Sequence, residues 1–125
     1  VNYIMAYNSG FDFVKTKCKE LLDEFEFIDI YLMALQTITH LAGYRKFCIE
    51  NEKMSKSKKT CSTSAETVYA FIHDNADYIE EHTALNDALI EMAIFVRCAK
   101  MKKHYTKNVH MWDCEERNKC FPKWR

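Results

Sequence analysis

The chain has 125 residues, of which 48% are hydrophobic and 29% are charged, and its net charge is zero at neutral pH. This composition predicts one globular domain with a hydrophobic core and excludes a disordered tail. The balanced charge excludes simple bulk attraction to nucleic acid, although acidic residues gather between Glu66 and Glu91, and basic residues gather between Arg45 and Lys59 and again after Arg97.

The cysteines and the apolar stretches indicate the compartment. Six cysteines are spread along the chain without Cys-x-x-Cys spacing, which favours reduced thiols over a disulfide framework. The apolar stretches are too short to cross a membrane, and no signal-peptide pattern opens the chain. We therefore expect a soluble cytoplasmic protein.

The N-terminal quarter of the chain predicts two strands with a helix between them. A short apolar run from Asn2 to Ala6 precedes a polar turn and is typical of a buried strand. Apolar residues at helical spacing then predict a helix that begins near Phe11. A second buried strand is expected from Phe27 to Ile30, around Asp29.

The middle of the chain is predicted to be helical on both sides of a polar connection. Residues Tyr31 to Ala42 have helical apolar spacing, and this helix is expected to end near Gly43. The stretch from Asn51 to Ser64 is rich in Lys, Ser and Thr and predicts a solvated loop. A short helix from Ala65 to Ile72 should follow, with Ser64 as its N-cap.

The longest helical pattern runs from about Thr83 to Lys102. The residues of its apolar stripe, which we expect to face the core, are Leu85, Ala88, Leu89, Met92, Phe95 and Val96. The predicted order is therefore strand, helix, strand, helix, loop and helix. This order is typical of an α/β unit with a small parallel strand pair.

Two distant segments each place a carboxylate near the start of a helix: AYNSGFD from Ala6 to Asp12, and HTALND from His82 to Asp87. In order and spacing they resemble the second and third motifs of the DEDDh 3′-5′ exonucleases, relatives of proofreading subunits within the ribonuclease H-like fold. The resemblance covers roughly Tyr3 to Phe95. It implies that residues 1–103 are the C-terminal, helix-rich portion of such a domain and that residues 104–125 form a basic aromatic tail.

The resemblance implies metal-dependent hydrolysis at the 3′ end of single-stranded DNA or RNA. Asp12 and Asp87 would help to hold two divalent ions, Mg²⁺ or Mn²⁺, which prefer carboxylate oxygens. His82 would be the general base that takes a proton from the attacking water, because the unperturbed pKa of imidazole is close to neutral. Asn8 and Phe11 would lie on the substrate side, with turn formation by Asn8 and core packing by Phe11 as the structural alternatives.

The motif residues also have plain structural interpretations. Asp12 would stabilise the start of its helix through the helix dipole and the unpaired amides there. His82 would suit an exposed position ahead of a helix. The occurrence of both motifs in the family's order, with the Asp29 strand between them, favours the exonuclease interpretation.

The family's first motif, D-x-E on the opening strand of its sheet, has no counterpart ahead of Tyr3. Its carboxylates would have to come from an upstream segment, from a partner chain or homodimer that completes the sheet, or from Asp113 and Glu115, which match in type but lie after the last helix. We therefore expect little hydrolysis by this chain alone. The alternative function is a catalytically incomplete module that binds nucleic acid or a protein partner.

The tail combines potential metal ligands with aromatic and basic residues. His104, His110, Cys114 and Cys120 could bind zinc, but their spacings match no compact zinc pattern. The aromatic side chains of the tail, interleaved with basic residues, suit either stacking on the bases of a single strand or packing as a terminal cap. The sequence leaves these two interpretations open.

Overall fold

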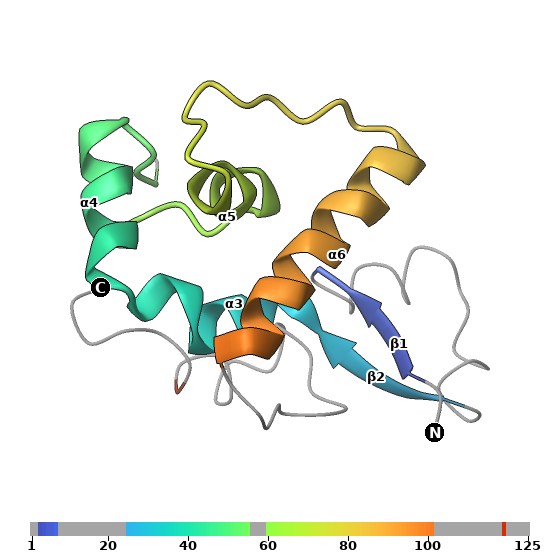
Figure 1. The fold of residues 1–125 in the computed structure, drawn as a ribbon. Helices are drawn as coiled ribbons and strands as arrows, with labels where there is room; N and C mark the ends of the chain where they lie inside the picture. Colours follow the sequence, from blue (N-terminus) through green and yellow to red (C-terminus); the bar gives the residue numbers. More distant parts are fainter. Residues whose placement is uncertain (1–2, 8–24, 56–59, 102–118, 120–125) are drawn as a thin grey trace.

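The structure is a computed structural model, and it describes residues 3–7, 25–55, 60–101 and 119. These residues form a mixed α/β structure in which a two-stranded parallel sheet packs with helices (Figure 1). The elements in chain order are β1 (Tyr3–Ala6), β2 (Glu26–Asp29), α3 (Ile30–Gln36), the 3-10 helix η1 (Ile38–His40), α4 (Ala42–Glu50), α5 (Ala65–Ile72) and α6 (Ala84–Met101).

The predicted parallel strand pair is confirmed. Strands β1 and β2 run in the same direction, with Ala6 opposite Asp29. Asp29 is fully buried, and its carboxylate accepts a hydrogen bond of 3.0 Å from the backbone N–H of Tyr31. Because this side chain caps the first turn of α3, β2 passes into the helix without a loop.

The prediction of one helix from Tyr31 to Ala42 is wrong for its second half. Helix α3 ends at Gln36, and η1 and α4 replace the remainder. Thr37 has non-helical backbone angles, and its hydroxyl donates to the carbonyl of Met33 at 2.7 Å. A threonine hydroxyl that bonds back to the preceding turn competes with regular helix hydrogen bonding. Gly43 consequently lies in the first turn of α4 and does not end a helix.

The two later helices have nearly the predicted bounds. Helix α5 spans Ala65–Ile72, and the hydroxyl of Ser64 accepts a hydrogen bond of 3.2 Å from the N–H of Thr67, as expected of an N-cap. Helix α6 spans Ala84–Met101 and confirms the predicted long helix. None of the described helices is long and apolar enough to cross a membrane.

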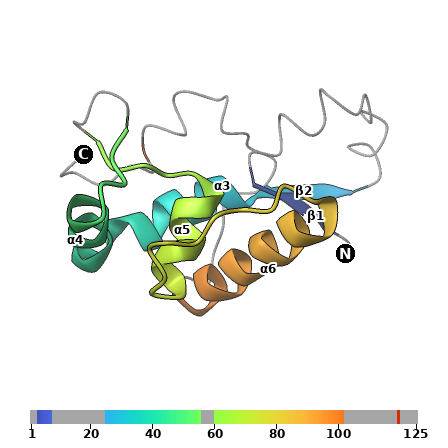
Figure 2. The same ribbon diagram turned by 90° about the horizontal axis from the view of Figure 1, so that it is seen from above.

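The face of α6 that was predicted to be buried is in fact the outer one. In the predicted stripe, Phe95 is half-buried, and the other members, Leu85, Ala88, Leu89, Met92 and Val96, are exposed. The buried residues are Ile90, Ile94 and Cys98. This inner face packs against α3 and α5 (Figure 2). Helix α6 is therefore rotated relative to the expectation.

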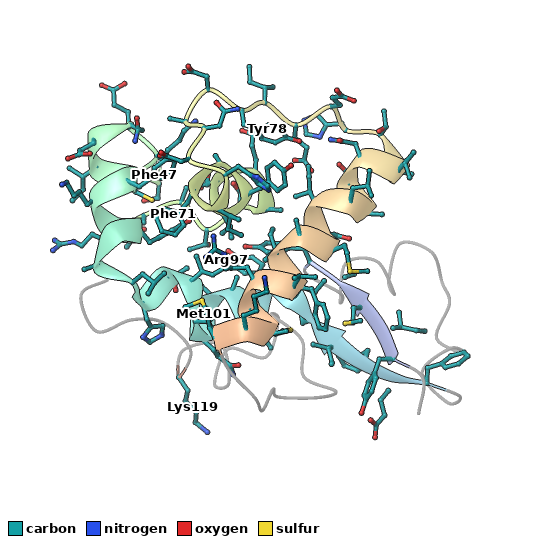
Figure 3. The ribbon with its side chains drawn as sticks, viewed as in Figure 1. Phe47, Phe71, Tyr78, Arg97, Met101 and Lys119 are labelled. Atoms are coloured by element: carbon teal, nitrogen blue, oxygen red, sulfur yellow. The ribbon has the colours of Figure 1, made fainter. Side chains whose placement is uncertain are left out.

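The core extends from the sheet through α3 to the space between α4 and α5. The ring of Phe71 meets the rings of Tyr44 and Phe47 edge-on, with centroid distances of 5.2 and 5.6 Å (Figure 3). Edge-to-face contacts of this kind stabilise aromatic pairs beyond the area that they bury. The core also contains Cys48 and Cys98 as free thiols, and burial raises the pKa of Cys48 to about 12.

Candidate active site at the N-terminus of α6

Residues 73–83 connect α5 to the N-terminus of α6 (Figure 1), and several polar contacts fasten this loop. The carboxylate of Glu66 accepts a hydrogen bond of 2.8 Å from the N–H of Glu80. The amide of Asn86 donates to the hydroxyl of Tyr78 at 3.2 Å, and the ring of Tyr78 packs on Tyr69 with a centroid distance of 4.7 Å (Figure 3). The loop is thus held to both helices.

Thr83 and His82 shape the turn that begins α6. The hydroxyl of Thr83 accepts a hydrogen bond of 3.2 Å from the N–H of Asn86, so one amide that lacks a helical partner is satisfied. His82 has a backbone φ of 57°, in the left-handed region that residues other than glycine seldom adopt. Its side chain is 77% exposed. The turn therefore presents an imidazole to solvent beside the helix N-terminus.

Glu80 links His82 to Asp87. Its carboxylate lies 3.9 Å from Nδ1 of His82, and its side chain is only 17% exposed. Burial raises the pKa of Glu80, and a hydrogen bond shared with the Asp87 carboxyl and the like charge of Asp87 raise it further. Glu66 acts in the same direction, and His82 opposes the shift. The site thus favours a proton or another cation between these carboxyl groups.

One carboxylate oxygen of Asp87 has no hydrogen-bond donor in the described part of the chain. Its Oδ1 is buried, and no donor among the described residues reaches it, so a hydrogen bond from Glu80 requires that Glu80 be protonated. A buried carboxylate oxygen without a donor is unfavourable, and a proton or a divalent cation would relieve that cost. Asp87 therefore fits the role of a metal ligand. Within the described ranges, however, no three His, Cys, Asp or Glu side chains are grouped so as to hold a metal ion.

A hydrogen bond connects this end of α6 to the sheet. The carboxylate of Glu91, one turn after Asp87, accepts the N–H of Tyr7 at 3.1 Å. Tyr7 directly follows β1, so the acidic side of α6 lies at the carboxyl end of that strand. In open α/β sheets this edge is where ligands bind. Asn8 and Asp12 follow Tyr7 closely in the sequence.

The structure brings together two of the predicted site residues, His82 and Asp87, through Glu80. The remaining candidates lie outside the described residues; they are Asn8, Phe11, Asp12, His104, His110, Asp113, Cys114, Glu115 and Cys120. Sequence reasoning did not single out Glu66 or Glu80. The only sequence signal for them was the acidic stretch in which both lie.

No family model, no curated protein and no solved structure matches this chain.

Proposed function

We propose that this chain is the portion of a DEDDh-type exonuclease, with a ribonuclease H-like fold, that carries the second and third catalytic motifs. Its reaction would be metal-dependent hydrolysis of phosphodiester bonds at the 3′ end of single-stranded DNA or RNA. The observation that carries this proposal is that one end of α6 combines the exposed imidazole of His82 with the carboxylate of Asp87, whose buried Oδ1 has no donor among the described residues. The same helix contacts the end of β1, from which the segment with Asp12 continues.

In this proposal each residue has a distinct task. Asp87, together with Asp12, would hold divalent ions, which when bound lower the pKa of a water and neutralise charge on the phosphate. His82 would accept the proton of the attacking water, and its exposed position allows it to approach a bound strand. Glu80, 3.9 Å from Nδ1, would stabilise the imidazolium that results.

The missing D-x-E motif limits what the chain would do alone. In the described part of the structure β1 pairs only with β2, and in the family fold the D-x-E strand would pair with the other edge of β1. An upstream segment, a partner chain or a second copy could supply that strand by adding to the sheet beside β1. The alternative function remains a module of the same fold that binds nucleic acid or a protein partner without cleaving.

Metal binding is the first test. Mn²⁺ or Mg²⁺ should raise the midpoint of thermal unfolding, because a ligand that binds only the native state stabilises it. Asp87→Asn should abolish this response. Asp77→Asn is the matched control, because Asp77 is an exposed acid in the same loop, and it should keep the full response. An undiminished response in Asp87→Asn would place the metal elsewhere and refute the proposed site.

Hydrolysis is the second test and separates the two candidate functions. A 5′-labelled single strand of DNA or RNA, incubated with the chain and Mn²⁺, should shorten slowly from its 3′ end. His82→Asn should lower that rate by about 10²- to 10⁴-fold, the usual contribution of a general base. Binding of metal and strand without any shortening would favour the alternative. Absence of both binding events would refute both functions.

A further inference from the structure

The outer face of α6 exposes a row of apolar side chains. The exposed fraction falls from 73% at Leu85 to 43% at Val96. We call the row the outer seam; its members are Leu85, Leu89, Met92, Val96 and the smaller Ala99. Single exposed apolar residues are ordinary on a protein surface, but a contiguous apolar row marks an interaction surface.

The spacing of the outer seam is that of a helix–helix contact. Its members follow one another at intervals of four, three, four and three residues. This average of 3.5 residues is the a/d repeat by which two helices interlock their side chains, and it is narrower than the stripe by which a helix covers a globular core. The neighbours Asn86, Ala88 and Ala93 are uncharged, so a docking helix would not have to desolvate charges there.

The charges on α6 indicate which helix would dock. Glu81, just before the helix, is exposed, whereas Arg97 and Lys100 are exposed on its C-terminal half. Exposed charge is thus negative in the loop just ahead of α6 and positive on its C-terminal half. An antiparallel copy of the same helix would set opposite charges against each other, and a parallel copy would set like charges together.

We propose that a second copy of this chain docks on the outer seam, with the two α6 helices antiparallel about a two-fold axis near Met92. This register places Leu85 opposite Ala99 and Leu89 opposite Val96 of the second copy, and Met92 packs against its own equivalent. Larger side chains thereby face smaller ones. A self-complementary two-fold interface is the commonest form of oligomer. The proposal does not depend on the exonuclease assignment.

Sedimentation velocity or light scattering over a range of concentrations tests the interface. The full chain should show a monomer–dimer equilibrium, and Leu89→Glu should raise its dissociation constant by about tenfold or more, as expected for a central apolar residue. Leu89 is exposed in the monomer, so the variant should fold normally. Ile49→Glu, on the exposed face of α4, is the matched control and should dimerise like the unchanged chain. A chain that stays monomeric, or a Leu89→Glu variant that dimerises equally well, would overturn the proposal.

Charge reversal tests the orientation. Lys100→Glu should weaken the dimer, because it places a negative charge near Glu81 of the second copy. The double variant Lys100→Glu with Glu81→Lys should restore the dissociation constant to within a few-fold of the original. A parallel pair would show no such rescue, and its absence would overturn the antiparallel arrangement. Circular dichroism of each variant confirms that the helix is intact.

Discussion

Both faces of α6 carry apolar side chains, but one face is buried and the other is exposed. The inner residues Ile90, Ile94 and Cys98 are at most 2% exposed, whereas Leu85 and Leu89 on the outer face are at least 60% exposed. Hydrophobicity alone therefore does not decide how this helix is rotated. Polar residues determine the rotation of the helix, because they lie on its inner side and contact other parts of the chain there.

Glu91 is the clearest of these polar residues. Its carboxylate accepts the backbone N–H of Tyr7, and this contact is possible only if Glu91 faces the sheet. The carboxyl group of Asp87, one turn earlier, lies beside that of Glu80 on the same side. Rotating the outer seam inward would break both contacts and expose Ile94. A buried amide or carboxylate without a partner costs about 1–3 kcal/mol, which is enough to choose between two similar apolar stripes.

The largest expected effect is a difference in unfolding free energy between substitutions on the two faces of α6. Ile94→Ala should lower the free energy of unfolding by about 2–5 kcal/mol, the range for removing a fully buried aliphatic side chain. Leu89→Ala should change it by no more than about 0.5 kcal/mol in the monomer, because the side chain is already in water. Urea titrations at low protein concentration measure both. Equal losses would show that the outer seam is covered within one chain, and would also contradict the proposed dimer.

A smaller effect should identify the contact that fixes the rotation. Glu91→Ala leaves the N–H of Tyr7 without its acceptor and should cost about 1–3 kcal/mol. Glu91→Gln is the matched variant, since its amide oxygen can still accept that hydrogen bond, and it should lose less. If urea titration gives the two variants equal losses, the charge of Glu91 matters and the hydrogen bond to Tyr7 does not.

Local signals in the sequence were sufficient for much of the fold. The apolar residues around Asp29 predicted β2, and the serine before Ala65 predicted the start of α5, because a cap acts on amides only a few residues away. The break after Gln36 was not predicted. Thr37 ends α3 by bonding to Met33 and to the thiol of Cys98 on α6, and the second of these contacts is visible only in three dimensions.

The candidate site was predictable in the same partial way. His82 and Asp87 were identified because they belong to one short motif. Glu80 was not identified, because its position depends on how the loop after α5 folds back on that helix. There the carboxylate of Glu66 accepts the backbone N–H of Glu80. The buried face of α6 was mispredicted because the outer seam contains more large apolar residues than the inner face. The sequence also does not reveal that Glu91 accepts a hydrogen bond from Tyr7.

The smallest expected effect is a pH dependence of stability that arises from Glu80. The pKa of Glu80 is raised above its ordinary value of 4.5, first by burial and then by Asp87 and Glu66, against the opposing charge of His82. The folded state therefore binds this proton more tightly than the unfolded state does. The resulting stabilisation is fully present below pH 4.5 and is lost as the pH rises through the folded-state pKa.

Glu80→Gln removes this titration. Glutamine does not ionise, so above the folded-state pKa the variant should be more stable than the original chain, by no more than about 1 kcal/mol. The advantage should shrink as the pH falls toward 4.5. Glu81→Gln, which removes an exposed carboxylate from the same loop, is the control for the loss of one negative charge. Thermal unfolding of the three chains between pH 4 and 8 measures this, and a Glu80→Gln difference that stays flat would show that the fold does not raise the pKa of Glu80.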